Sequence, residues 1–284
     1  MRAPPLVLWY ETRLVTDTPP LLELRGITKS FGSVQALTDV DLEVRQGEVM
    51  ALVGDNGAGK STLIKCVAGI HPYDEGEVFF EGEKVSINGP KDAARLGIEV
   101  VYQDLALCDN LDVVQNMYLG REAHDVIGRL REPEMEAKTA ETMKGLAVTT
   151  IRSTRQKVAS LSGGQRQSVA VARAVMWNSR LVILDEPTAA LGVAQTRQVL
   201  ELVKRLSQQG LAVVIISHNL HDVFEVANRI TVLRLGRSIA VYERDTTTQQ
   251  EVVHAITAGV ATKVAGISQT TDDDPVVAPG EAGA

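Results

Sequence analysis

Cysteine and aromatic residues are scarce in this chain of 284 residues. The two cysteines, Cys66 and Cys108, form neither a CxxC pair nor a Cys/His cluster, which argues against a disulfide framework or a cysteine-ligated metal. Aromatic residues make up only 4% of the sequence, so aliphatic side chains must fill the core. No apolar run reaches the roughly 18–20 residues that span a bilayer, so the sequence predicts no membrane span of its own.

A strong charge of either sign is also missing. The formal net charge is −7, and the hydrophobic content of 44% and charged content of 23% are ordinary for a globular protein. Part of the negative charge lies beyond Val264, where four acidic residues and no basic residue occur. This composition argues against general nucleic-acid binding, and no nucleic-acid partner is expected.

The two ends of the chain differ in character from its body. Residues 1–20 make a poor secretory signal, because Glu11 and Arg13 directly follow a short apolar patch and no small-residue cleavage site is present. We expect residues 1–20 to form a poorly ordered extension, and one hypothesis places the true start at Val15. Residues 265–284 are rich in Asp, Pro, Gly and Ala and are expected to be disordered.

Between these ends, predicted strands alternate with predicted helices. Short apolar runs predict buried strands at 48–54, 98–102, 181–184 and 212–217. Helical spacing follows Gly59, Ser162 and about residue 194. The alternation indicates βαβ units and a largely parallel sheet with both faces covered. Residues 104–157 are more polar, with an exposed helix predicted over 132–144, and this block is predicted to be a mostly helical insert.

The octapeptide GDNGAGKS, residues 54–61, matches G-x-x-x-x-G-K-[ST] between a buried strand and a helix. Glycines let successive backbone N–H groups form a nest for phosphate, and the helix N-terminus adds its dipole. Lys60 is expected to reach the β- and γ-phosphates, and Ser61 to ligate Mg²⁺. The predicted nucleotide-binding residues of this loop are Gly54, Asp55, Asn56, Gly57, Ala58, Gly59, Lys60, Ser61 and Thr62.

Two adjacent carboxylates, Asp185 and Glu186, end the apolar strand LVIL. In a parallel sheet this end lies near the phosphate loop, so Asp185 is predicted to hold Mg²⁺ through water. Glu186 leaves the strand in another direction and is predicted to orient or deprotonate the attacking water. Without the phosphate loop, the same pattern is also typical of a strand that ends at the surface.

The sequence LSGGQ, formed by Leu161, Ser162, Gly163, Gly164 and Gln165, opens another predicted helix. Its exposed backbone N–H groups and the hydroxyl of Ser162 indicate a second anion site, although a lone SGG would be read as an ordinary helix cap. One triphosphate cannot occupy two distant nests in a single copy. We therefore predict two copies arranged head to tail, each lending its LSGGQ to the other's nucleotide.

GDNGAGKS, LSGGQ, LVILDEP and then His218 after AVVIIS occur in the order found in the ATP-binding-cassette (ABC) ATPases, which residues 21–245 resemble. The resemblance implies an α/β P-loop NTPase with a mostly parallel central sheet. It also implies an N-terminal antiparallel β subdomain, a helical subdomain over about 104–177 and a C-terminal helix within 246–264. ATP and Mg²⁺ are the cofactors implied.

The same resemblance implies roles for three further residues. Gln103 is similar to the Q-loop glutamine, which senses Mg²⁺ and the attacking water and couples to the membrane partner. His218 is similar to the switch histidine that contacts the γ-phosphate, and Phe31 to the aromatic residue that stacks on adenine. Judged without the family, Gln103 is a polar residue after a strand, His218 a structural histidine and Phe31 a core residue.

The sequence around these motifs, including DEPTAALGV, resembles that of the subgroup that powers bacterial sugar importers. This implies an ATP-hydrolysing subunit on the cytoplasmic face of the cell membrane, with a monosaccharide as the expected cargo. The implied partners are permease subunits, a second copy or a related cassette, and indirectly an extracytoplasmic sugar-binding protein. The alternatives are another transporter type or a non-transport cassette ATPase acting in translation or DNA repair. A single cassette and an acidic tail argue against the non-transport alternative.

Gly192 departs from the family pattern. Many cassette ATPases carry Asp at this position, where it contacts the phosphate loop of the partner copy, whereas the sugar-importer subgroup often reads as this chain does. Backbone groups of residues 190–192 are expected to make the contact with the partner's phosphate loop that the Asp side chain makes in other cassettes.

Overall fold

A computed structural model of the chain describes residues 19–259, which form ten β-strands and eight α-helices. The expectations for the N-terminal extension before residue 19, including a start at Val15, and for the tail 265–284 lie outside the described residues. Within residues 19–259, no helix combines the length and apolar character that a membrane span requires.

The N-terminal part forms an antiparallel sheet of four strands in the order β2-β1-β4-β5. A tight turn at Gly32 joins the two longest strands, because this glycine adopts the left-handed conformation with φ 59°. The resemblance to the cassette ATPases had implied this subdomain. Its strands are β1 (Leu22–Phe31), β2 (Val34–Val44), β4 (Glu75–Phe80) and β5 (Glu83–Val85).

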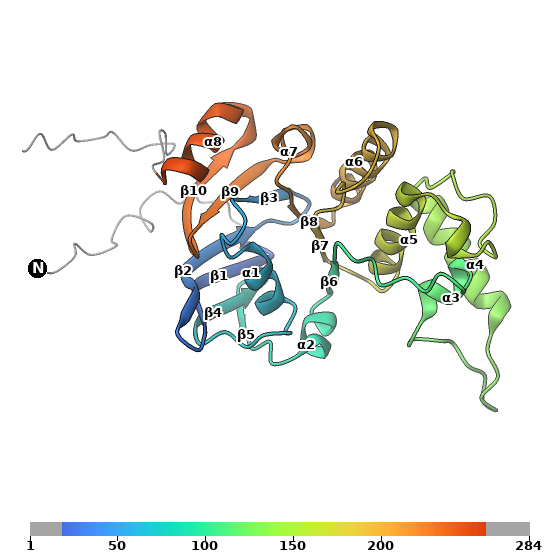
Figure 1. The fold of residues 1–284 in the computed structure, drawn as a ribbon. Coiled ribbons are helices and arrows are strands. Elements are labelled where there is room, and N and C mark those ends of the chain that lie inside the picture. Colours follow the sequence, from blue (N-terminus) through green and yellow to red (C-terminus); the bar gives the residue numbers. More distant parts are fainter. Residues whose placement is uncertain (1–18, 260–284) are drawn as a thin grey trace, which may run out of the picture.

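The central sheet has six strands in the order β10-β9-β3-β8-β7-β6 and is parallel except at β10, which pairs antiparallel with β9 (Figure 1). Four of its strands were predicted as apolar runs: β3 and β8 are buried throughout, β7 is buried up to Asp185, and β6 is buried at its two ends. The six strands are β3 (Val49–Val53), β6 (Ile98–Val101), β7 (Leu181–Asp185), β8 (Ala212–Ile216), β9 (Arg229–Arg234) and β10 (Arg237–Glu243).

Each face of the central sheet has its own core, because successive side chains of a strand point to opposite faces. On β3, Val49, Ala51 and Val53 pack with α5 (Gly163–Val175), α6 (Val193–Gln208), α7 (Leu220–Val226) and α8 (Gln249–Ala258). Met50 and Leu52 pack on the other face with α1 (Lys60–Val67), α2 (Pro90–Arg95) and the antiparallel sheet. In Figure 1, α7 and α8 lie above β3 and β9, and α1 lies below these strands.

The block 104–157 contains α3 (Val113–Tyr118) and α4 (Glu132–Gly145), and the latter corresponds to the helix predicted over 132–144. Loops make up more of this block than the sequence led us to expect. Residues 119–131 form an irregular hairpin with one isolated bridge, His124 to Leu130, because Gly120 and Gly128 adopt positive φ and interrupt helical geometry. Together with α5, the block projects beyond the β6 edge of the sheet (Figure 1).

Candidate functional site

A cavity of about 690 Å³ lies over the carboxyl edge of the parallel strands. It brings together residues 56–62 of the phosphate loop with Gln103, Asp185, Glu186 and His218. These side chains come from four segments that follow β3, β6, β7 and β8. Parallel neighbours end at the same edge of a sheet, which is why residues far apart in sequence converge here.

The phosphate loop curls tightly into α1. Gly54 has φ 152°, and a Cβ on it would lie 2.1 Å from the Leu233 carbonyl oxygen, so only glycine fits. Lys60 is 8% exposed, and its Nζ donates to the carbonyl oxygens of Gly54 (2.6 Å) and Asp55 (3.0 Å). Burial lowers the pKa of Lys60, whereas the charges of Glu186, Asp185 and Asp55 act in the opposite direction.

The two acids face different surroundings. Burial raises the pKa of Asp185, the neighbouring Glu186 charge raises it further, and Lys60 and Lys65 act against this shift. Glu186 adopts the left-handed conformation with φ 51°, and its N–H donates to the Ile216 carbonyl at 2.9 Å. This turn directs the Glu186 side chain away from that of Asp185 and toward the segment after β8.

His218 contacts Glu186 directly, with its Nδ1 2.8 Å from Glu186 Oε2. The His218 side chain is 71% exposed and that of Glu186 is 18% exposed. An ionised carboxylate only accepts, so any hydrogen in this contact has to come from Nδ1. The sequence marked both residues separately but contained no sign that they pair.

Gln103 lies two residues after β6, is exposed and lines the cavity. The loop that it begins is fixed by Arg173 of α5, which donates to the carbonyl oxygens of Leu105 and Ala106, each at 2.9 Å. Burial lowers the pKa of Arg173, and the charges of Glu99 and Cys108 oppose this shift. Sequence reasoning missed Arg173, although a single arginine within the small apolar stretch VAVARAV was a usable signal.

Phe31 is the last residue of β1 and is 45% exposed, so it is not the core residue that its sequence context alone favoured. Its ring packs edge-to-face with that of His71 at 5.2 Å. Phe31 does not line the cavity, whereas Val34 (64% exposed) and Leu235 (74% exposed) do. These two exposed apolar side chains were not anticipated from the sequence.

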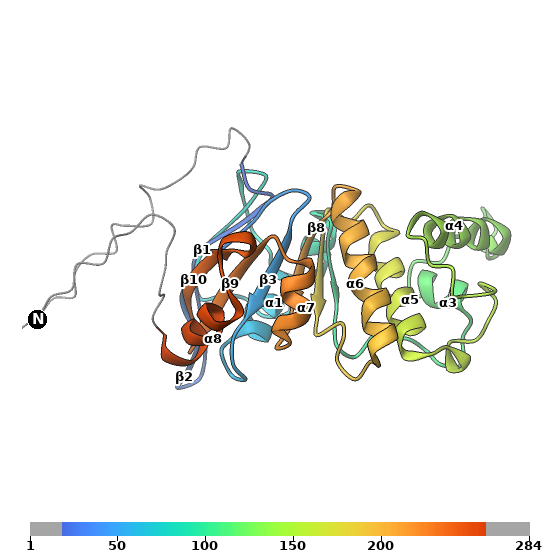
Figure 2. The same ribbon diagram turned by 90° about the horizontal axis from the view of Figure 1, so that it is seen from above.

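The LSGGQ segment opens α5 and does not line this cavity. Ser162 Oγ accepts from the Gln165 N–H at 3.4 Å, and Gln165 Oε1 accepts from the Ser162 N–H at 2.8 Å, which is a capping box. Leu161 is buried, Gly163 is exposed, and Gly164 packs beside Gln195. Figures 1 and 2 place α5 beyond the β6–β7 edge of the sheet, on the side away from α1.

Gly192 is the N-cap residue that precedes α6, and its N–H donates to Gln195 Oε1 at 3.3 Å. No atom lies within 4 Å of where a Cβ on Gly192 would stand, so the position does not require glycine on steric grounds. The turn before it contains Ala190 with φ 60°.

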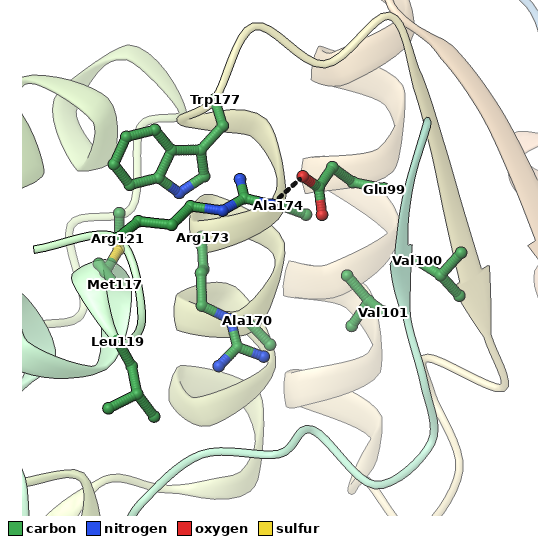
Figure 3. Close-up of a pocket in the computed structure, with 10 residues that line it drawn as sticks. All are labelled: Glu99, Val100, Val101, Met117, Leu119, Arg121, Ala170, Arg173, Ala174 and Trp177. Atoms are coloured by element: carbon green, nitrogen blue, oxygen red, sulfur yellow. Dashed lines mark hydrogen bonds and ion pairs between the residues drawn. The ribbon is translucent and has the colours of Figure 1, made fainter. Parts of the chain in front are cut away.

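A second, smaller cavity of about 220 Å³ lies between β6, α3 and α5 (Figure 3). Arg121 pairs with Glu99 at 3.0 Å and lies over the Trp177 ring, with 5.3 Å from its guanidinium carbon to the ring centroid. Leu119, 47% exposed, and Met117 provide apolar lining. The cavity therefore lies where the insert meets the central sheet, next to β6, the strand that leads to Gln103.

Residues 37–189 match the ABC transporter family. The chain is 47% identical to the xylose/arabinose import ATP-binding protein XylG of Sulfolobus acidocaldarius over 86% of this chain and 96% of that protein. It is 45% identical to the fructose import ATP-binding protein FrcA of Rhizobium meliloti over 84% of this chain and 94% of that protein. Among solved structures, the dimeric post-hydrolysis state of the ATP-binding cassette MJ0796, bound to ADP and Pi, superposes with TM-score 0.66 and 27% identity. That match covers 78% of this chain and 98% of the other.

Proposed function

This chain belongs to the ABC transporter family and is an ATPase, and we propose that it energises the import of a sugar, in particular a monosaccharide, through a membrane permease. The observation that carries the sugar assignment is the 47% identity to XylG, which extends over 96% of that protein. A permease-bound subunit of this kind would lie on the cytoplasmic face of the cell membrane. An extracytoplasmic sugar-binding protein would deliver the cargo to the permease.

We assign the triphosphate of ATP to the phosphate loop, residues 54–62. The buried ammonium of Lys60 lies 2.6 Å from the Gly54 carbonyl oxygen and would exchange such contacts for β- and γ-phosphate oxygens. Adenine would lie toward Val34 and Leu235, whose exposed apolar side chains offer it a surface, with Phe31 at the end of β1 nearby.

The residues around the cavity fit Mg²⁺. Ser61, Asp185 and Gln103 each provide an oxygen, the ligand that this ion prefers, and all three line the same cavity. Among residues 19–259, no cluster of three or more His, Cys, Asp or Glu side chains could hold a metal alone. That suits an ion that keeps waters and phosphate oxygens as its other ligands. When bound, Mg²⁺ would neutralise phosphate charge.

Glu186 is proposed to hold and deprotonate the water that attacks the γ-phosphate. His218 contacts Glu186 through Nδ1, and its Nε2 is proposed to face the γ-phosphate. Lys60 and the backbone N–H groups of the loop would stabilise the charge that develops on the phosphate oxygens. Hydrolysis then depends mainly on positioning and charge stabilisation, as in phosphoryl transfer generally.

Two cassettes are proposed to close head to tail over two ATP molecules. In support, LSGGQ is a capped helix start that lies outside the cavity of its own chain. A second copy, or a related cassette, would supply it from across the interface. The residues from the partner chain would complete each site, and the exposed turn at residues 190–192 would lie against the partner's phosphate loop.

The permease is proposed to dock at the cavity of Figure 3, around Leu119, Arg121 and Trp177. Its apolar lining suits a short helical segment of a membrane protein. Arg173 lines this cavity and also donates to the loop after Gln103. A movement of the docked permease helix would therefore shift that loop and, with it, Gln103 in the nucleotide cavity.

Co-purification from membranes tests the proposal. The chain should bring down a permease, and the sugar that the associated binding protein carries should stimulate ATP hydrolysis in the reconstituted complex. Leu119→Glu should abolish the stimulation and leave basal hydrolysis within about twofold of wild type, because a carboxylate cannot be desolvated in an apolar contact. Stimulation by a non-sugar substrate instead would contradict the sugar assignment.

A further inference from the structure

Asp222 is a buried carboxylate to which the proposed hydrolysis assigns no role. It lies in the first turn of α7 and is 3% exposed. Its Oδ2 accepts a hydrogen bond from Thr188 Oγ1 at 2.7 Å, and His221 Nδ1 is 3.8 Å from its Oδ1. Among residues 19–259, no lysine or arginine forms an ion pair with it. Burying a carboxylate without a cation costs folding free energy. The short hydrogen bond from Thr188 therefore suggests that Asp222 has a specific role.

The contact joins two segments that already meet at the proposed hydrolytic residues. Thr188 follows Glu186 by two residues, and Asp222 follows His218 by four. The same two segments contact each other through Glu186 and His218 at 2.8 Å and through the Glu186 N–H and the Ile216 carbonyl at 2.9 Å. Thr188 and Asp222 therefore close a loop of contacts around Glu186 and His218.

Glu186 needs such support because its backbone is in the left-handed region, with φ 51°. A non-glycine residue keeps this conformation only where its surroundings hold it. On the amino side, β7 fixes the chain up to Asp185. On the carboxyl side, the Ala189 N–H donates to the Glu186 carbonyl at 3.1 Å, and the side chain of Thr188 is anchored on Asp222.

We propose that Thr188 and Asp222 form a positioning pair that holds Glu186 and His218 in the geometry needed for hydrolysis. This rests on the proposed roles of Glu186 and His218. Neither residue of the pair lines the nucleotide cavity, so the pair is proposed to act by fixing where the Glu186 carboxylate stands. A displacement of about 1 Å at a reacting group costs up to about 100-fold in rate, so loss of one hydrogen bond here should lower kcat.

The test compares Thr188→Val with Thr188→Ser in steady-state ATP hydrolysis and in ATP binding. Valine keeps the shape and removes the hydroxyl, so kcat should fall by about tenfold or more while ATP affinity changes by less than about threefold. Serine keeps the donor and should restore kcat to within about twofold of wild type. Asp222→Asn keeps an oxygen that accepts from Thr188 and should lose less activity than Thr188→Val.

Thr247→Val is the matched control. Thr247 Oγ1 donates to Glu251 Oε2 at 2.9 Å, so it too joins a threonine to a carboxylate in the first turn of a helix, but at α8. The Thr247→Val variant should keep the wild-type kcat even if its melting temperature falls as much as that of Thr188→Val. Equal losses of kcat in the two variants would assign the Thr188 effect to stability alone and overturn the proposal.

Glu186→Gln separates this inference from the proposed function. If Glu186→Gln is inactive while Thr188→Val keeps the wild-type kcat, only the positioning pair is overturned. If Glu186→Gln hydrolyses ATP as wild type does, the proposed function of the site fails, and the positioning pair fails with it. In the Glu186→Gln background, Thr188→Val should cause no further loss of the residual rate, because the pair acts through Glu186.

Discussion

Nδ1 of His218 lies 2.8 Å from Oε2 of Glu186, and this contact joins the ends of two neighbouring parallel strands. It commits one imidazole nitrogen to the carboxylate of a residue that lines the same cavity as His218. The arrangement supports the proposed roles of His218, which are to orient Glu186 and to donate to the γ-phosphate.

His218→Ala should lower kcat by about 100-fold or more and leave ATP affinity within about fivefold, because it removes a group that acts in hydrolysis and not in ground-state binding. Single-turnover hydrolysis with equilibrium ATP binding measures both. His254→Ala, in α8 and outside the cavity, is the control. A large rise in the dissociation constant with an unchanged rate would assign His218 to binding instead.

Lys60→Ala should abolish measurable ATP binding, since the ammonium is the only lysine or arginine side chain among the described residues that lines the cavity. Titration with a fluorescent ATP analogue measures this directly. Lys84→Ala removes a surface lysine that pairs with Glu77 and should bind ATP as wild type does. Tight binding by the Lys60 variant would contradict the assignment of the phosphate loop.

Asp185→Asn should raise the melting temperature of the chain at pH 7 and abolish Mg²⁺-dependent hydrolysis. Burial raises the pKa of Asp185 above its ordinary value of 3.8, so the folded chain binds this proton more tightly than the unfolded chain. Stability therefore falls as pH rises through the range above 3.8, and the loss persists at neutral pH. Asparagine carries no such charge.

Thermal unfolding at a series of pH values measures this effect. The advantage of Asp185→Asn over wild type should shrink as pH falls toward about 4. Asp245→Asn, at a side chain that is 79% exposed, should change the melting temperature little at any pH. A lower melting temperature for Asp185→Asn at pH 7 would show that its charge stabilises the fold.

Head-to-tail pairing predicts that two inactive variants rescue each other. In a dimer of Lys60→Ala with Ser162→Arg, one composite site is doubly altered and the other is intact, so mixing should restore roughly a quarter of wild-type hydrolysis. Lys60→Ala mixed with Glu186→Gln should not recover, because each composite site then keeps one altered residue. Recovery in both mixtures, or in neither, would contradict the arrangement.

Local sequence pattern was enough to predict most of the central sheet, the phosphate loop and the Asp185–Glu186 pair, whereas Gln103 and His218 were assigned only through the family resemblance. Apolar runs marked β3, β6, β7 and β8, and parallel topology then placed Gln103, Asp185, Glu186 and His218 at one edge with the phosphate loop. The fold class is a consequence of the same alternation of strands and helices.

Long-range contacts between side chains could not be predicted from the sequence. The Glu186–His218 contact and the donation from Arg173 to the loop after Gln103 depend on how separate segments pack, which no local periodicity encodes. Val34 and Leu235 looked like ordinary strand or turn residues, yet they are exposed at the cavity. Residues 119–131 belong to the block predicted to be mostly helical. They form a hairpin instead, because Gly120 and Gly128 adopt positive φ.

Turnover of Glu186→Gln at saturating ATP tests the assignment of the hydrolytic site most directly. The variant should bind ATP with an affinity within about threefold of wild type, hydrolyse it about 100-fold to 10,000-fold more slowly and accumulate as an ATP-bound dimer. Glu201→Gln, on the exposed face of α6, should hydrolyse ATP at the wild-type rate. Hydrolysis by Glu186→Gln at the wild-type rate would contradict the assignment of this residue to the attacking water.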